Sequence, residues 1–204
     1  MFSRFTIFNT PVIRPIMGLI ARVCLFLAGW KIKGTLPGEK RFVLVAAPHT
    51  SNWDFVVMLL ISFVIRLRVY SLMKKEMFRF PFHHVFRWLG AIPVDRSRST
   101  NLVNTLAGEI HRVDAAALAI SPAGTRSSAR YWKSGFYHIA RQAGVPVVLG
   151  FLDFGRKIGG IGPSLIPSGD MEADMKIIRN FYDGMLGRHP EKTILPAFPP
   201  KSAS

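Results

Sequence analysis

The stretch FVLVAAPHTSNWDFVVMLLISFVI, residues 42–65, holds the polar segment PHTSNWD between two apolar runs. The run at 42–47 is typical of a buried strand, and the run at 53–65 is typical of a helix. His49 and Asp54 lie five positions apart, so on one regular helix they would point about 140° away from each other. A turn that carries His49 into a helix begun near Asp54 brings them together and suits the positive end of the helix dipole. We therefore predict a strand–turn–helix junction with an oriented imidazole.

The rest of the chain alternates between the same two kinds of element. Further strands are predicted at 68–73, 91–94, 117–121 and 146–152, and further helices at 82–89, 100–112, 133–143 and 171–185. The glycine-rich run 155–164 is predicted as a turn. Such alternation predicts an α/β fold, a single domain with a largely parallel or mixed sheet flanked by helices. We place this domain at 35–196 and a tail at 197–204, with disorder expected at 1–10 and in the tail.

The composition is both apolar and basic. Hydrophobic residues make up 49% of the 204 residues, and 27 Lys and Arg against 12 Asp and Glu give a net charge of +15. This balance suits an anionic surface, either membrane phosphates or nucleic acid. The single cysteine, Cys24, excludes an internal disulfide and gives no sign of an oxidising compartment.

Residues 1–34 are predicted to form an N-terminal amphipathic membrane-contact segment. Residues 15–30 are mostly apolar, but Arg22 interrupts them. The uncharged pieces are shorter than the roughly 20 residues that a membrane span needs, and no small-residue cleavage site follows in the manner of a signal peptide. A helix of this kind can lie in the membrane interface with its arginines at headgroup level. The alternative is a terminal helix that packs on the core.

Two further groups of residues carry candidate chemistry. The loop SPAGTRSS, residues 121–128, follows a predicted strand, and Arg126 in it can bind a phosphate with help from backbone N–H groups of the turn. The alternative is an ordinary polar loop, just as His49 and Asp54 can be two unrelated caps. Basic residues also alternate with aromatic ones in the second group, Lys74, Lys75, Arg79, Arg87 and Arg96 among Phe78, Phe80, Phe82, Phe86 and Trp88. This pattern fits a membrane interface, nucleic acid or a solvated helix face.

Several other chemistries have no support in the sequence. It contains no G-x-S-x-G, P-loop, H-E-x-x-H or C-x-x-C motif. The pair His83–His84 lacks carboxylates or cysteines at metal-ligand spacing, so we predict no metal site. Long apolar runs interrupt the basic residues and no recognition motif occurs, so we expect no nucleic-acid partner.

In this order, these stretches resemble the glycerolipid acyltransferase family, typified by 1-acylglycerol-3-phosphate acyltransferases. HTSNWD looks like the family's H-x4-D block, and SPAGTRS is similar to its F-P-E-G-T-R-S block. KKEMFRFP and LGAIPVDR look like its second block, and YWKSGFYHIA and GVPVVL like the segments that follow. The positions that match in these stretches are Lys75, Pro81, Gly90, Arg96, Lys133, Gly135 and Pro146. The resemblance runs from about residue 40 to 152.

The resemblance implies an O-acyltransferase that needs no cofactor. His49 and Asp54 are then catalytic: His49 takes the proton of an acceptor hydroxyl, and Asp54 holds the imidazole. The acceptor is a lysophospholipid or glycerol-phosphate-type molecule, and the co-substrate is acyl-CoA or acyl carrier protein. Substrate binding is expected from a basic and glycine-containing set: Lys75, Arg96, Gly124, Thr125 and Arg126. Membrane lipids are expected partners, with the protein peripheral or monotopic on the cytoplasmic face of the cell inner membrane.

This sequence departs from the family pattern near the proposed site. Ser121 and Ala123 stand where the third block has Phe and Glu, and His84 replaces a Gly of the second block. The loss of the Glu supports a second reading, a catalytically weak or inactive relative that binds membrane lipid. From the sequence alone, we expect Ala123→Glu to raise activity on lysophosphatidate.

Overall fold

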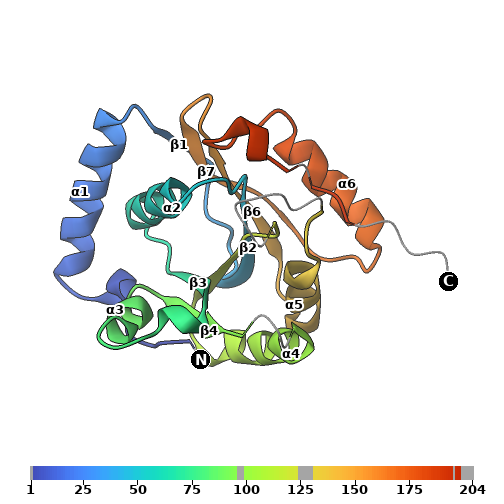
Figure 1. The fold of residues 1–204 in the computed structure, drawn as a ribbon, viewed down its shortest axis with the longest axis horizontal. Helices are drawn as coiled ribbons and strands as arrows, with labels where there is room; N and C mark the ends of the chain where they lie inside the picture. The colour runs from blue at the N-terminus through green and yellow to red at the C-terminus, as the bar shows by residue number, and fades with distance from the viewer. Residues whose placement is uncertain (1, 96–98, 124–130, 195, 199–204) are drawn as a thin grey trace.

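The computed structural model describes residues 2–95, 99–123, 131–194 and 196–198. Its centre is one sheet whose seven strands run in the order β1-β7-β6-β2-β5-β3-β4 (Figure 1). Neighbouring strands are parallel except for β6 and β7, which are antiparallel. The strands are β1 (Lys31–Lys33), β2 (Arg41–Ala47), β3 (Val69–Lys74), β4 (Ala91–Val94), β5 (Ala116–Ile120), β6 (Val147–Asp153) and β7 (Ile158–Leu165). The mixed sheet of an α/β domain is confirmed.

Helices cover both faces of this sheet. They are α1 (Ile13–Leu27), α2 (Trp53–Val64), α3 (His83–Trp88), α4 (Ser99–Glu109), α5 (Gly135–Ala143) and α6 (Met171–Tyr182), with short 3-10 turns η1 (Ile7–Asn9), η2 (Lys75–Met77), η3 (Ile110–Arg112) and η4 (Pro190–Lys192). Helices α1 and α2 lie on one side of the sheet in Figure 1, and α4, α5 and α6 lie on the other. The sheet is therefore the middle layer of three.

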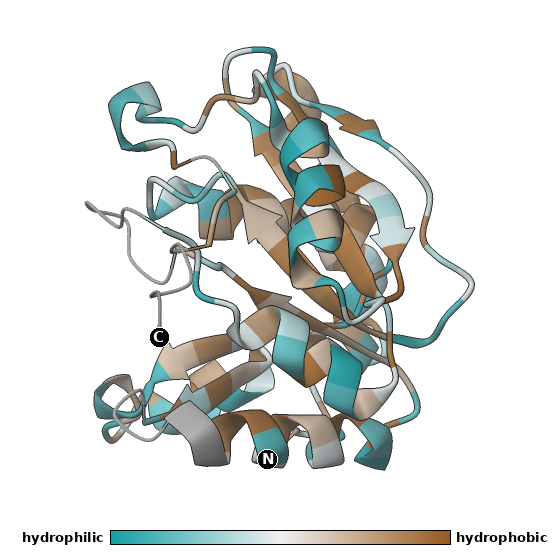
Figure 2. Cartoon of the chain, turned by 90° about the vertical axis from the view of Figure 1, so that its right-hand side faces the viewer, coloured by the Kyte–Doolittle hydropathy of each residue, from teal (hydrophilic) through white to brown (hydrophobic). Residues whose placement is uncertain are grey.

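The central strands are apolar because both of their faces are buried, as is usual for parallel sheets. In β2, Val43 and Val45 pack with side chains of α4, α5 and α6. Phe42 and Leu44 point the other way and pack with Ala21 of α1 and Phe63 of α2. Figure 2 shows the contrast, with largely hydrophobic strands behind helices that alternate between polar and apolar residues.

Helix α6 is fixed to the sheet and to α5 by buried hydroxyls. Tyr182 donates from its Oη to the carbonyl oxygens of Val45 (3.2 Å) and Gly150 (2.9 Å). Tyr137 on α5 donates to Asp174 Oδ2 (2.7 Å), at the first turns of α6. Burial raises the pKa of Tyr182 well above its ordinary value. These bonds hold the C-terminal part of the chain against β2 and β6.

Two sequence predictions are wrong, and each has a physical reason. The run 155–164 is not a turn, because most of it forms β7, where glycines are needed for packing: a Cβ at Gly159 would lie 2.8 Å from Ile61. The helix predicted at 82–89 forms as α3, although Phe82 and Val85 of its apolar side are exposed. Residues 2–9 are not disordered, because Phe2, Ile7 and Phe8 are buried in the core.

The N-terminal segment is joined to the domain in two ways. Helix α1 packs along α2, and its Ala21 and Leu25 are buried. The inner face of α1 therefore packs on the core, as the alternative in the sequence analysis states. Strand β1 pairs with β7, so the sheet itself begins inside the segment 1–34. In the tail, Ala197 and Phe198 pack near Trp132 and Phe136, while residues 199–204 lie outside the described part of the chain.

Candidate active site

His49 and Asp54 meet as the sequence predicts. Strand β2 ends at Ala47 and α2 begins at Trp53, so Asp54 lies in the first turn of the helix. His49 Nδ1 is 3.1 Å from Asp54 Oδ2. The same oxygen accepts the backbone N–H groups of Thr50 (2.7 Å) and Ser51 (2.8 Å). Asp54 Oδ2 therefore contacts the imidazole and two backbone N–H groups of the turn between β2 and α2.

The two side chains differ in exposure, as a base and its orienting group should. The Asp54 side chain is 4% exposed and that of His49 is 26% exposed. Asp54 also lies where the positive end of α2 favours a negative charge. Its contact with Nδ1 fits the tautomer in which Nδ1–H donates to the carboxylate, which leaves Nε2 with a lone pair that can accept a proton.

A large cavity opens beside His49. Its volume is about 2070 Å³, more than the roughly 300–1,000 Å³ of a typical small-molecule site. Leu44, Met58 and Ile61 line it on the face covered by α1 and α2, and Leu72, Ile120 and Phe136 line it on the opposite face. The cavity thus extends along both faces of the sheet from the carboxyl ends of β2 and β5.

Cations also line this cavity. They are Lys74 at the end of β3, Lys133 before α5, and Arg141 on α5. Lys75, which the sequence selects, is exposed as the first residue of η2 and is not among the lining residues, although its neighbour Lys74 is. Arg96, Gly124, Thr125 and Arg126 lie outside the described residues. The structure therefore brings His49, Asp54 and a basic rim together.

Sequence reasoning missed a segment from the far end of the chain. Residues 184–194, the C-terminal segment, pass directly over the turn that carries His49. The backbone N–H of His189 donates to Thr50 Oγ1 (3.1 Å), and a Cβ on Gly187 would lie 2.5 Å from the same oxygen. The Arg188 guanidinium lies 5.2 Å from the centre of the Trp53 ring, within the range of a cation–π contact. No motif in this segment signals its place at the site.

Among the residues that the structure describes, no group of three or more His, Cys, Asp or Glu side chains is arranged to hold a metal ion. The acid–base pair and the basic rim are therefore the chemical groups that the described site offers. A paired imidazole with an open nitrogen, next to a large apolar cavity, can move a proton to or from a substrate that carries a long apolar chain.

Comparisons with known proteins show what the chain is similar to. A family model described as Acyltransferase matches residues 31–148. A 1-acyl-sn-glycerol-3-phosphate acyltransferase of Haemophilus influenzae is 30% identical over 131 residues, which are 60% of this chain and 53% of that protein. The chain thus spans about half the length of this curated relative.

A solved structure shares the fold. It is the crystal structure of the 1-acyl-sn-glycerophosphate (LPA) acyltransferase PlsC from Thermotoga maritima, with a TM-score of 0.56 and 16% sequence identity. The match covers 83% of this chain and 76% of the other. It supports the arrangement of sheet and helices described above.

Proposed function

The chain belongs to the acyltransferase family, and we propose that it moves a fatty acyl group from an acyl thioester to a hydroxyl of a lysophospholipid or glycerol-phosphate-type acceptor. The observation that carries this proposal is the His49–Asp54 pair, joined at 3.1 Å beside an apolar cavity of about 2070 Å³. The relative named for such an activity supports it as well. The donor is acyl-CoA or acyl carrier protein, and no cofactor is required.

His49 acts as base and then as acid. Nε2 takes the proton of the acceptor hydroxyl, and the resulting alkoxide oxygen attacks the thioester carbon. The tetrahedral intermediate then expels the thiolate, and His49 returns the proton to the sulfur. Asp54 stays ionised and stabilises the imidazolium between these two steps. The oxyanion of the intermediate requires hydrogen-bond donors, for which we propose backbone N–H groups near Gly124.

Basic residues around the pair bind the phosphate groups of the substrates. Arg126 and Lys75 are the proposed ligands of the acceptor phosphate, together with Arg96 and the turn formed by Gly124 and Thr125. The family resemblance selects these positions, and Lys74 and Lys133 add positive charge to the cavity that they line. Guanidinium groups suit a phosphate because two parallel N–H groups can donate to it.

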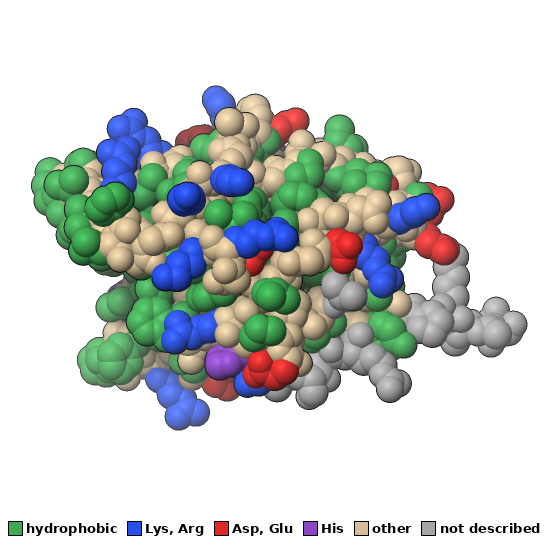
Figure 3. Space-filling view, turned by 90° about the horizontal axis from the view of Figure 1, so that it is seen from above, with side chains coloured by type: hydrophobic (Ala, Val, Ile, Leu, Met, Phe, Trp, Pro, Cys, Tyr) green, Lys and Arg blue, Asp and Glu red, His purple; other side chains and the backbone are tan. Residues whose placement is uncertain are grey.

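The outer face of α1 supports attachment to a membrane. Its apolar side chains repeat at helical spacing and are not covered by other described residues: Ile16, Leu19, Ile20, Val23, Phe26 and Leu27. Figure 3 shows hydrophobic side chains gathered at the left end of the molecule, which is the α1 side in Figure 1, with Lys and Arg beside them. No helix in the described ranges has the length and apolar character to cross a bilayer.

A second apolar surface adjoins the first. Phe80 and Phe82 are exposed, as are Arg79 and Arg87 of the same segment. This region lies near the beginning of α1, because Trp88 Nε1 donates to Thr10 Oγ1 (3.1 Å). We propose that both surfaces enter the interface of the cytoplasmic face of the inner membrane, where rings and basic residues are favoured.

A lysolipid panel tests the proposed function. Purified protein is mixed with acyl-CoA and individual lysolipids, and both free thiol and new diacyl products are measured. His49→Ala should reduce turnover by about 10²-fold or more, the usual scale for a general base. His84→Ala, an exposed histidine outside the cavity, is the matched control and should retain full activity.

The same lysolipid panel tests the alternative that the protein is a catalytically weak or inactive relative that binds membrane lipid. A lipid-binding relative without catalysis would bind vesicles but release no thiol with any acceptor. Equal turnover by His49→Ala and the unaltered protein would contradict the proposed mechanism.

A further inference from the structure

The C-terminal segment, residues 184–194, is a part of the site that the family match does not cover. The match ends at residue 148. The segment is held in place over the His49 turn by the bond from His189 N to Thr50 Oγ1. It is also fixed internally, because the backbone N–H of Gly187 donates to Thr193 Oγ1 (3.1 Å), and at its end, because Trp132 Nε1 donates to the carbonyl of Ile194 (3.3 Å). A side chain on this segment therefore has a defined position relative to His49.

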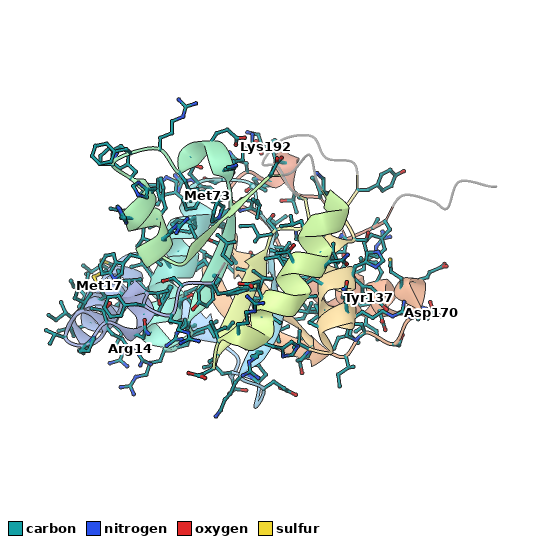
Figure 4. All side chains as sticks on the ribbon, turned by 90° about the horizontal axis from the view of Figure 1, so that it is seen from below. Arg14, Met17, Met73, Tyr137, Asp170 and Lys192 are labelled. Atoms are coloured by element: carbon teal, nitrogen blue, oxygen red, sulfur yellow. The ribbon has the colours of Figure 1, made fainter. Side chains whose placement is uncertain are left out.

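Lys192 is the side chain that this arrangement brings to the site. It lines a small cavity of about 10 Å³ together with His49, Ser121 and Ala123. Figure 4 labels Lys192 at the upper edge of the molecule, at the same end as Met73, which lines the large cavity. Among the described residues, Lys192 forms no ion pair: its neighbour Glu191 contacts His189 Nδ1 instead (3.7 Å). The Lys192 ammonium is therefore available to an anion.

Ser121 supplies a second polar group to the same small cavity. Its Oγ is buried and has no hydrogen-bond partner among the described residues. Such a group is costly unless a ligand or water satisfies it. Ser121 lines the large cavity as well, as does His49. The small cavity has about the size that one oxygen atom with its hydrogens, such as a water, requires.

The small side chain of Ala123 leaves the small cavity unfilled. Ala123 is buried and ends at Cβ, so the small cavity remains open between His49 and Lys192. A longer side chain at this position would fill it. The residues at 121 and 123, where the sequence departs from the family pattern, therefore line one small cavity that Lys192, an exposed residue, also borders.

We propose that Lys192 and Ser121 form a phosphate subsite next to His49, in which one phosphate oxygen of a substrate accepts a hydrogen bond from Ser121 Oγ and pairs with the Lys192 ammonium. This inference rests on the proposed function, since both of its substrates carry phosphate groups. The phosphate belongs either to the acceptor headgroup or to the carrier of the acyl donor, and the experiment below distinguishes these sources.

The kinetic test pairs each substrate with a form that lacks phosphate. Acceptors are lysophosphatidate and monoacylglycerol, and donors are acyl-CoA and an acyl N-acetylcysteamine thioester. Lys192→Ala should raise the KM of one phosphate-bearing substrate by about tenfold, the scale of a charge-assisted hydrogen bond. It should leave kcat within about twofold and the phosphate-free counterpart unchanged. Lys192→Arg should restore the KM, and Ser121→Ala should raise the same KM as Lys192→Ala.

The control is Lys176→Ala, which removes the same charge from the exposed side of α6, away from both cavities. If Lys192→Ala and Lys176→Ala have the same KM values, the subsite is contradicted. The subsite is equally contradicted if Lys192→Ala weakens phosphate-bearing and phosphate-free substrates alike.

An equilibrium measurement keeps this inference separate from the proposed function. Binding of coenzyme A, and of vesicles that contain lysophosphatidate or monoacylglycerol, is measured without turnover. Absence of transfer to every acceptor would contradict the proposed function, whereas tighter phosphate-dependent binding by the unaltered protein than by Lys192→Ala would still support the subsite. Identical binding by these two proteins would overturn the subsite whatever the activity.

Discussion

At the scale of single residues, the site depends on which partners each side chain meets, and only some of them are near in sequence. The meeting of His49 and Asp54 could be predicted because both belong to one turn, so a five-residue spacing and a strand–helix junction determine the geometry. The position of Lys192 at the small cavity beside His49 could not be predicted. Thr50 and His189, whose bond places it there, are 139 positions apart, and nothing in the local pattern of either residue indicates the other.

The structure changes the expected effect of a substitution at Ala123. This residue is only 7% exposed and borders a cavity of about 10 Å³, whereas Glu adds four heavy atoms. The new side chain has to displace Lys192 or Ile194, and its carboxylate would pair with the Lys192 ammonium. We therefore expect Ala123→Glu to lower transfer to phosphate-bearing acceptors, and to lower the free energy of unfolding by about 1–3 kcal/mol through overpacking.

The measurement is acyl transfer together with urea unfolding, and Ala173→Glu on the exposed side of α6 serves as the control. A gain of activity in Ala123→Glu would show instead that the sequence-based expectation is right and that the missing Glu is a defect.

At the scale of elements, the errors of prediction come from residues whose local preference differs from their tertiary role. Glycines favour turns, so 155–164 looks like a loop. In the fold, Gly159 and Gly162 give β7 the flat surface that Leu152 and Phe181 require. The remaining strands were predictable because continuous apolar runs have few alternatives in a sheet that is covered on both faces. Strand β1 has only three residues, too few to form a pattern.

The attachment of α6 to α5 gives a prediction about stability. Tyr137 Oη donates to Asp174 Oδ2 and accepts the N–H of Gly169 (3.0 Å), and Figure 4 shows Tyr137 beside Asp170 at the start of α6. Tyr137→Phe removes both bonds, so at pH 7 it should lower the free energy of unfolding by about 1–3 kcal/mol.

The pH dependence of this effect follows from the pKa of Tyr137. Burial, and then the hydrogen bond to Asp174, raise this pKa above its ordinary value. Above about pH 10 the unfolded chain loses the tyrosine proton before the folded chain does, and unfolding then becomes easier as the pH rises. The difference between the two proteins should shrink between pH 7 and about pH 10.5 in denaturant unfolding. A constant difference would mean that the hydroxyl does not titrate differently in the two states.

At the scale of the whole molecule, charge and apolar surface act together. In the proposed attachment to a membrane, the net charge of +15 draws the protein to anionic lipid, and the outer face of α1 provides the apolar contact. Leu19 and Phe26 are 64% and 81% exposed, so their replacement costs the fold little.

Leu19→Ser with Phe26→Ser should weaken binding to anionic vesicles by more than tenfold, because burial of each side chain in the interface contributes about 1.5–3 kcal/mol. Ile177→Ser, at an exposed apolar position on α6, is the control and should bind normally. Vesicle sedimentation at low and high salt provides the measurement, and salt should weaken binding of the unaltered protein. Unchanged binding by the double variant would exclude α1 as the docking face.

The order of the strands also determines when this domain can form during synthesis. Strand β2 lies between β5 and β6 in the sheet, and both leave the ribosome long after it. At about 5–20 residues per second, the residue that bonds Thr50, 139 positions later, follows it by roughly 7–28 s. Until residues 116–153 have been made, the nascent chain exposes β2 without its two neighbouring strands, and the turn that carries His49 is not covered until residue 189. The site is therefore completed only when a segment 139 residues after Thr50 has been synthesised.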